Sequence, residues 1–200
     1  DFIIYAHDDM YFLPKWDLIL KKEISKLNNN LFYLSGTMMG PKEHIDFDCG
    51  DSYKNFDEAK LLNNYTNYNL YDHQGTHWAP HVIHKDLWNK INGLDENFDP
   101  GFGSDPDLNM RLWQEGVRYF KGINDCKVYH FGSISLRKKK NLVTNNGARQ
   151  FLKKWGMSIS FFKKHYLRSM QVFKEPLEEP KKNLSYHFEN FICKIKLIFL

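Results

Sequence analysis

Acidic side chains gather on one loop that is rich in glycine and proline. Residues 93–111 read GLDENFDPGFGSDPDLNMR and contain four aspartates and one glutamate: Asp95, Asp99, Asp105, Asp107 and Glu96. An amphipathic run from Leu108 to Trp113 follows, so the loop opens into a helix. Carboxylates on such a loop are poor core material, and we expect them to face solvent or a ligand. The alternative is a capped helix start, with Asp105 as the N-cap and Pro106 as the first helical residue.

A second acidic group follows an apolar run near the start of the chain. Phe2 to Ala6 is bounded by charge, which predicts a buried strand of a parallel sheet, and His7, Asp8 and Asp9 come directly after it. Ligands of open α/β sheets bind beyond the carboxyl ends of strands. Adjacent carboxylates repel each other's charged forms, and a divalent cation bound through oxygen would relieve that repulsion. The alternative is a solvated turn in which Asp8 or Asp9 caps the next helix.

Four histidines lie between residues 73 and 84, at positions 73, 77, 81 and 84. Neither HExxH nor paired Cys/His spacing is present, so we expect polar or packing roles for most of them rather than a zinc site. Trp78, beside a glycine and a proline, could stack on a sugar ring or a base. Burial in the core is the alternative.

The hydrophobic patterns predict an α/β domain. Strands are expected at 2–6, 31–34, 81–83, 118–120 and 127–129, and helices at 15–27, 85–91, 106–115, 149–155 and 160–170. Ser35, Gly36 and Thr37 are expected at the end of the second strand. Residues 42–74 are polar and periodic only in pieces, with a helical turn at 57–62. A stretch of this kind indicates a functional insertion or lid on the substrate side.

Charge is distributed unevenly along the 200 residues. Residues 137–200 hold 15 Lys/Arg and 4 Glu, whereas residues 1–136 hold 13 basic and 20 acidic side chains. We therefore expect a catalytic domain at 1–136 and a basic helical extension at 137–200, which includes the basic run Arg137 to Lys140. The amphipathic stretch 188–200 predicts peripheral contact with a membrane surface, or a docking helix. Its aromatics follow helical spacing, so nucleic acid is not an expected partner.

Three further observations concern the cellular compartment of the protein and whether the sequence is a fragment of a longer one. The sequence has no run of about 18 apolar residues and no basic leader segment. Its cysteines (Cys49, Cys126 and Cys193) are isolated and odd in number, which favours a reducing compartment and a cytoplasmic protein. The chain begins without Met, inside a predicted strand, and we expect it to be a fragment of a longer protein.

Three motifs occur in order: a strand ending in His7-Asp8-Asp9, the loop-to-helix sequence GSDPDLNMR at 103–111, and a strand ending in VYHFGS at 128–133. In this order they resemble the GT-A glycosyltransferases of family 2, over roughly residues 1–156. FLKKWG at 151–156 is similar to a segment of the family's bacterial and viral members. The resemblance implies a GT-A-like, Rossmann-related mixed sheet flanked by helices. It also implies that the fold is incomplete at the N-terminus, because the family's first βαβ units are absent.

The resemblance also implies roles for individual residues. Asp9 holds the last position of the family's metal-binding DxD motif, and His130 matches a histidine that completes the metal shell in some members. Asp105 matches the general base. On the substrate side it implies His7, which stands where the first DxD acid often lies, Asp8, Trp78, Gly103, Asp107 and Arg111. Asp107 and Arg111, four residues apart, are expected to pair and shape the loop.

The implied activity is metal-dependent, inverting transfer of a sugar from a nucleotide-sugar donor to a hydroxyl acceptor. The cation would be Mn²⁺ or Mg²⁺, the expected donor is a UDP-sugar, and the acceptor is a carbohydrate, a glycolipid or a protein. We expect the parent protein to be active and the isolated 200 residues to be inactive, since part of the donor site is missing. The alternatives are a non-catalytic carbohydrate- or nucleotide-binding module and a metal-dependent hydrolase.

Overall fold

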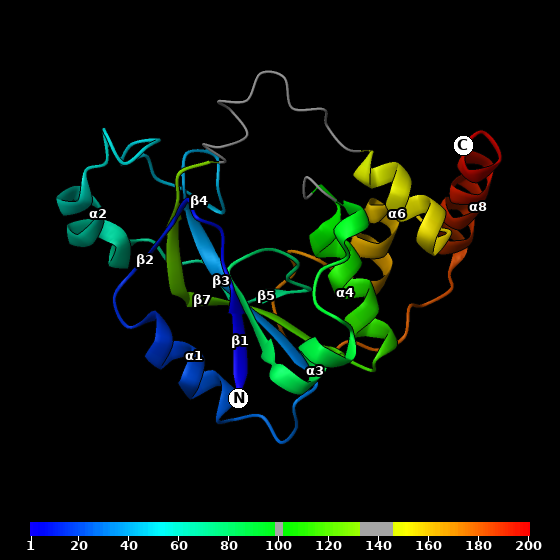
Figure 1. Ribbon diagram of the computed structural model, residues 1–200, viewed down its shortest axis with the longest axis horizontal. Coiled ribbons are helices and arrows are strands. Elements are labelled where there is room, and N and C mark those ends of the chain that lie inside the picture. Colours follow the sequence, from blue (N-terminus) through cyan, green and yellow to red (C-terminus); the bar gives the residue numbers. More distant parts are fainter. Residues whose placement is uncertain (99–101, 133–145) are drawn as a thin grey trace.

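The structure, a computed structural model, describes residues 1–98, 102–132 and 146–200, and it has a mixed α/β architecture (Figure 1). The strands are β1 (Phe2–Tyr5), β2 (Met10–Phe12), β3 (Phe32–Gly40), β4 (Ile45–Asp46), β5 (His73–Gln74), β6 (His81–His84) and β7 (Tyr119–His130). The helices are α1 (Trp16–Ile24), α2 (Glu58–Asn64), α3 (Lys85–Lys90), α4 (Ser104–Gln114), α6 (Gly147–Trp155), α7 (Ile159–Phe161) and α8 (Leu184–Ile198). Short 3₁₀ turns η1 (Tyr65–Asn67) and η2 (Glu96–Phe98) and a π-helical turn η3 (Phe162–Leu167) complete the described elements.

The strands form one mixed sheet in the order β1-β6-β3-β7-β2. β3 and β7 are parallel, whereas β6 is antiparallel to both β1 and β3. The sheet is therefore mixed, as the family resemblance implied, but the expectation that the first strand belongs to a parallel sheet was wrong, because its neighbour β6 is antiparallel to it. β1 is also an edge strand rather than a buried one, with the side chains of Phe2 and Ile4 exposed. Because β1 and β3 are both antiparallel to β6, β1 runs in the same direction as β3 and β7. The carboxyl ends of these three strands therefore lie at the same edge of the sheet.

β7 replaces the two short strands predicted at 118–120 and 127–129. It is one continuous strand, and its register against β3 shifts after the Gly36–Ile123 pair, so that Thr37 faces Lys127. The Thr37 hydroxyl donates to the Ile123 carbonyl at 2.9 Å across this bulge. The prediction that Ser35, Gly36 and Thr37 end their strand was also wrong. They lie inside β3, where the hydroxyl groups of Ser35 and Thr37 are buried but hydrogen-bonded.

Helices cover both faces of the sheet, because neighbouring residues of a strand point to opposite sides. On one face α1 packs its apolar side, including Leu20, against Leu34 and Val82. On the other face Tyr33 and Ile83 pack with α4, α6 and η3 in the largest cluster, to which the C-terminal extension contributes Phe151, Phe162, Leu167 and Leu177. α8 packs outside this layer, against α6 and α7 (Figure 1). The predicted boundary at 136/137 and the basic run Arg137 to Lys140 lie outside the described residues.

Residues 42–74 contain β4, α2, η1 and β5. The predicted helical turn at 57–62 is confirmed as α2, and the carboxylate of Asp57 caps it by accepting from the Lys60 amide at 2.8 Å. Ile45, Cys49 and Leu61 of this stretch are buried in one cluster with residues of β3 and β7. In the part of the chain that the structure describes, every helix is too short or too polar to cross a membrane.

Candidate metal and catalytic site

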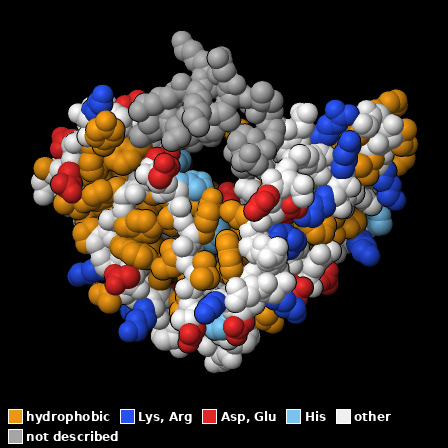
Figure 2. Space-filling view, in the orientation of Figure 1, with side chains coloured by type: hydrophobic (Ala, Val, Ile, Leu, Met, Phe, Trp, Pro, Cys, Tyr) orange, Lys and Arg blue, Asp and Glu red, His pale blue; other side chains and the backbone are white. Residues whose placement is uncertain are grey.

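His7, Asp9 and His130 come together at the carboxyl ends of β1 and β7. The atoms that each could offer to a metal ion all lie within 4.8 Å of one another. His7 and Asp9 lie on the connection from β1 to β2, and β2 pairs with β7 so that Met10 faces His130. The Phe131 amide also donates to the Asp9 carbonyl at 3.0 Å. Strand pairing therefore holds this cluster together, and Figure 2 shows a hollow on this face with histidine and acidic side chains at its rim.

Glu43 fixes the orientation of the His130 ring. Its Oε1 accepts a hydrogen bond from Nδ1 of His130 at 2.6 Å. The other ring nitrogen, Nε2, is buried without a hydrogen-bond partner and lies 3.4 Å from Oδ2 of Asp9. A carboxylate on one nitrogen that leaves the other free for a cation is the usual environment of a metal-binding histidine. Gly40 permits the arrangement, since a Cβ at its positive φ would collide with the His130 carbonyl.

The acidic side chains around the cluster shift the pKa values of its two histidines. Burial lowers the pKa of His130, but the Glu43 hydrogen bond and the charges of Glu43 and Asp9 outweigh burial and leave the pKa raised. Burial lowers the pKa of His7 by more than the charge of Asp9 raises it. The acidic surroundings thus attract one positive charge, which a proton on His130 or a bound cation would supply.

Asp105 lies in the first turn of α4, close enough to Tyr5 for its charge to act on the Tyr5 hydroxyl. Burial alone raises the pKa of its carboxyl group to about 6. Burial raises the pKa of Tyr5 and of Tyr33, and the negative charge of Asp105 raises both pKa values further. The Tyr5 ring in turn packs against His7, with ring centroids 5.6 Å apart. A weakly acidic carboxyl group therefore stands near the three clustered side chains without joining them.

The alternative in which Asp105 caps its helix was wrong by two residues. Gly103 occupies the cap position with a left-handed φ of 90°, and α4 begins at Ser104. A Cβ on Gly103 would come 3.1 Å from the Gly147 backbone and from the Phe98 ring, so the position favours glycine on two counts. Gly103 therefore acts through the backbone, by turning the chain so that Asp105 lies on the first turn.

The predicted pairing of Asp107 with Arg111 is confirmed. Nε of Arg111 donates to Oδ2 of the fully buried Asp107 at 2.9 Å. Trp155 and Lys154 on α6 donate to the other carboxylate oxygen, each at 2.8 Å. Arg111 also donates to the carbonyls of residues 91 and 93. The contacts of Asp107 with α6 and of Arg111 with the chain before and at the start of the acidic loop hold α4 in place, as expected of residues that shape the loop.

Trp78 and Asp8 lie outside the cluster. The Trp78 ring is buried, packs against His44 with centroids 4.2 Å apart, and donates from Nε1 to the Gly36 carbonyl at 2.8 Å. This placement matches the core alternative for Trp78. The side chain of Asp8 is exposed beside the cluster.

Two of the four clustered histidines in the sequence are core residues. His73 and His81 are buried, and both ring nitrogens of each lack a hydrogen-bond partner. The His81 ring lies between Tyr5 and Tyr33, with centroid distances of 5.1 Å and 4.7 Å, and burial lowers its pKa to about 3. These placements agree with the expected packing role.

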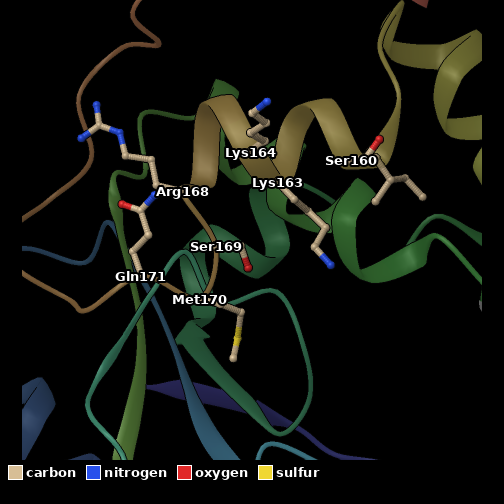
Figure 3. A pocket seen from close by; sticks show the side chains of 8 residues that line it. Ser160, Lys163, Lys164, Arg168, Ser169, Met170 and Gln171 are labelled. Carbon is tan, nitrogen blue, oxygen red and sulfur yellow. The ribbon is translucent and has the colours of Figure 1, made fainter. Parts of the chain in front are cut away.

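A separate cavity of about 590 Å³ lies beside η3 and is lined by Ile159, Ser160, Lys163, Lys164, Arg168, Ser169, Met170 and Gln171. Figure 3 shows that Lys163 and Arg168 leave the backbone in different directions. Lys164 pairs with Glu189, and the Ser169 hydroxyl contacts Nδ1 of His77 at 3.1 Å. The cations therefore do not converge on one point, and the cavity lacks the geometry of a specific anion site.

Comparison with known proteins does not identify a family for this chain. No protein-family model matches the sequence, and a search of curated proteins finds no significant match. Glu43 and Tyr5 were the two site residues that the sequence analysis missed. Glu43 is 87 residues from its partner, so only its place just after the turn-forming pair Gly40-Pro41 could have drawn attention to it.

Proposed function

We propose that this chain carries the metal site and the catalytic base of an inverting glycosyltransferase of the GT-A type, family 2. One observation carries the proposal: Nε2 of His130, which forms no hydrogen bond, lies with Asp9 and His7 in one cluster, while Asp105, with a raised pKa, interacts by its charge with the neighbouring Tyr5. Inverting transfer needs these two functions as separate groups, one for the leaving diphosphate and one for the acceptor hydroxyl. The sequence motifs that resemble the family supply the same residues.

The residues fit a divalent cation, and the donor set favours Mn²⁺ over Mg²⁺. Two imidazole nitrogens and one carboxylate oxygen suit a metal of intermediate softness, whereas Mg²⁺ prefers oxygen ligands and retained water. His7, Asp9 and His130 would hold the ion, and Glu43 would orient His130. When bound, the ion would supply positive charge to the diphosphate of a nucleotide sugar.

Asp105 supplies the base in this proposal. With a pKa of about 6, its carboxyl group is ionised at pH 7 yet basic enough to accept a proton from a sugar hydroxyl. The hydroxyl oxygen forms the new bond to the anomeric carbon, the bond from that carbon to the diphosphate oxygen breaks, and the diphosphate leaves with the electron pair. Asp107 and Arg111 hold the helix that presents Asp105.

The proposal is tested by calorimetric titration of UDP in the presence and absence of Mn²⁺. We expect metal-dependent binding that Asp9→Asn and His130→Ala abolish and Asp105→Asn preserves. Asp17→Asn, an acid in the first turn of α1, is the matched control and should change nothing. Product analysis of the parent protein with a panel of sugar nucleotides and added glycans then measures transfer.

Three results would contradict the proposal. UDP binding that is indifferent to Mn²⁺ or to Asp9→Asn would remove the metal site from the function. Release of free sugar without an acceptor, at a rate that acceptors do not change, would indicate a hydrolase. A parent protein that transfers sugar equally well with Asp105→Asn would exclude Asp105 as the base.

A further inference from the structure

α8 exposes a continuous apolar stripe to solvent. Its exposed large side chains recur every three or four residues, which places them on one face of the helix. They are Leu184, Phe188, Phe191, Ile195 and Ile198, with Phe199 directly beyond the helix. Single exposed apolar residues are common on protein surfaces, but a contiguous patch with three phenylalanines marks an interaction site.

The opposite face of α8 already has its packing partner. Tyr186 and Cys193 are buried in a cluster with Leu152 and Phe161 of the helices beneath. The carboxylate of Glu189 is bound by Lys164 and contacts His165. The helix is therefore fixed to the domain by one side, and rotation to bury the stripe would expose these groups. The stripe faces outward as a consequence of the native packing.

The surroundings of the stripe are basic. Residues 146–200 hold 11 Lys/Arg against 4 Glu. The only acid of α8, Glu189, is paired, whereas Lys194 and Lys196 are exposed and form no ion pair with the described residues. Figure 2 shows blue side chains bordering the apolar surface at the α8 end of the molecule. Phenylalanine and isoleucine beside unpaired lysine is the composition of helices that lie in a membrane interface.

We propose that α8 docks this domain on a membrane surface that contains anionic lipid, with the helix axis in the membrane plane. A helix of 15 residues spans about 22 Å, less than the hydrocarbon thickness of a bilayer, so it would lie along the surface and not cross it. The apolar stripe would enter the headgroup boundary, and Lys194 and Lys196 would meet the lipid phosphates. This docking does not depend on the proposed sugar transfer.

A second copy of the chain fits this face less well. The stripe has the spacing of a coiled-coil seam, but the helix positions beside it are His187 and Lys194 on one side and Ser185 and Ile192 on the other. No acid stands there to pair with Lys194 of a partner helix. Ile192 and Phe199 also make the apolar face broader than a two-residue seam.

Co-sedimentation with phosphatidylcholine vesicles, with and without phosphatidylglycerol, tests the proposal. We expect the wild-type chain to bind the anionic vesicles and to be released by high salt. Phe191→Glu should weaken binding by about tenfold or more, because it removes one buried phenyl group. Leu18→Glu on α1 is the matched control, since the two side chains are 59% and 58% exposed, and it should bind like the wild type. Lys194→Ala should cost about fivefold on anionic vesicles only.

Four outcomes would overturn the proposal. The first is a wild-type chain that fails to bind phosphatidylglycerol vesicles, and the second is equal loss of binding in the Leu18→Glu control. The third is salt-insensitive binding that both vesicle compositions support equally. The fourth is a dimer seen by analytical ultracentrifugation that Phe191→Glu abolishes, without vesicle binding, which would assign the stripe to a second copy. Wild-type salt dependence decides the matter even if a variant fails to fold.

Discussion

Replacement of Glu43 should weaken metal binding although Glu43 is not itself a proposed ligand. Its carboxylate holds Nδ1 of His130 at 2.6 Å and keeps Nε2 directed at Asp9. Glu43→Ala removes both the acceptor and the negative charge, so the ring loses its fixed orientation. Glu43→Gln keeps an acceptor oxygen at the same place and removes only the charge. The two variants therefore separate orientation from electrostatics.

Loss of such an orienting carboxylate costs about 10- to 100-fold in metal affinity, or about 1.4 to 2.7 kcal/mol. We expect Glu43→Ala near the upper value, since the hydrogen bond at 2.6 Å is short and His130 has no second one. Glu43→Gln should lie near the lower value. Electron paramagnetic resonance of free Mn²⁺ measures the dissociation constant directly and needs neither substrate nor turnover.

Glu58→Ala provides the control for these variants. Glu58 also forms one short hydrogen bond, from the Tyr11 hydroxyl at 2.6 Å, but it lies outside the cluster. The Glu58→Ala substitution removes the same charge from the chain as Glu43→Ala and should leave the Mn²⁺ affinity unchanged. If Glu43→Ala bound Mn²⁺ as tightly as the wild type, or if Glu58→Ala lost as much affinity, the assignment of His130 as an oriented ligand would fail.

Three further predictions concern stability. Burial raises the pKa of Asp105 from 3.8 to about 6. This shift means that the folded protein is destabilised by roughly 3 kcal/mol when the carboxyl group is ionised. Asp105→Asn should therefore raise the melting temperature at pH 7.5, and its advantage should shrink as the pH falls from about 6 to 4 and the native wild-type carboxyl takes up a proton. Glu23 is buried against Lys121 at 2.7 Å, and Glu23→Ala should cost about 3 kcal/mol in urea denaturation, with Glu23→Gln costing less. Gly75→Ala should destabilise far more than Gly156→Ala, because both have a positive φ but only the first Cβ would collide with backbone.

The sequence analysis predicted which candidate metal ligands lie together better than it predicted the strands. Asp9 and His130 were paired as metal ligands through the family resemblance, and the structure brings them together with His7. Their clustering depends on which strands share a direction, which local patterns do not encode. The same limit explains the errors in the sheet. An edge strand and a buried strand can both show a short apolar run, so Phe2 to Ala6 suggested a buried parallel strand.

The strand boundaries of β3 and β7 were predicted wrongly for a different reason: both strands contain polar residues in their interior. Ser35 and Thr37 resemble loop residues until their hydrogen-bond partners are known, and those partners, Thr76 and Ile123, are distant in sequence. Asn124 and Asp125 interrupt the pattern of β7, yet the strand continues through the bulge. Asp107 and Arg111 were predictable, because a pair four residues apart on a helix needs no tertiary information.

The outer edge of β1 affects how the protein behaves at high concentration. β1 ends the strand order of the described sheet, so one side of its backbone offers amide and carbonyl groups to any extended chain. The exposed side chains of Phe2 and Ile4 make that edge apolar as well. Such an edge is a template for strand addition and thus for aggregation, unless another segment covers it. A lysine in place of Ile4 would interrupt the template without disturbing the buried face of the sheet, and preparations of that variant should stay monodisperse at concentrations where the unmodified chain associates.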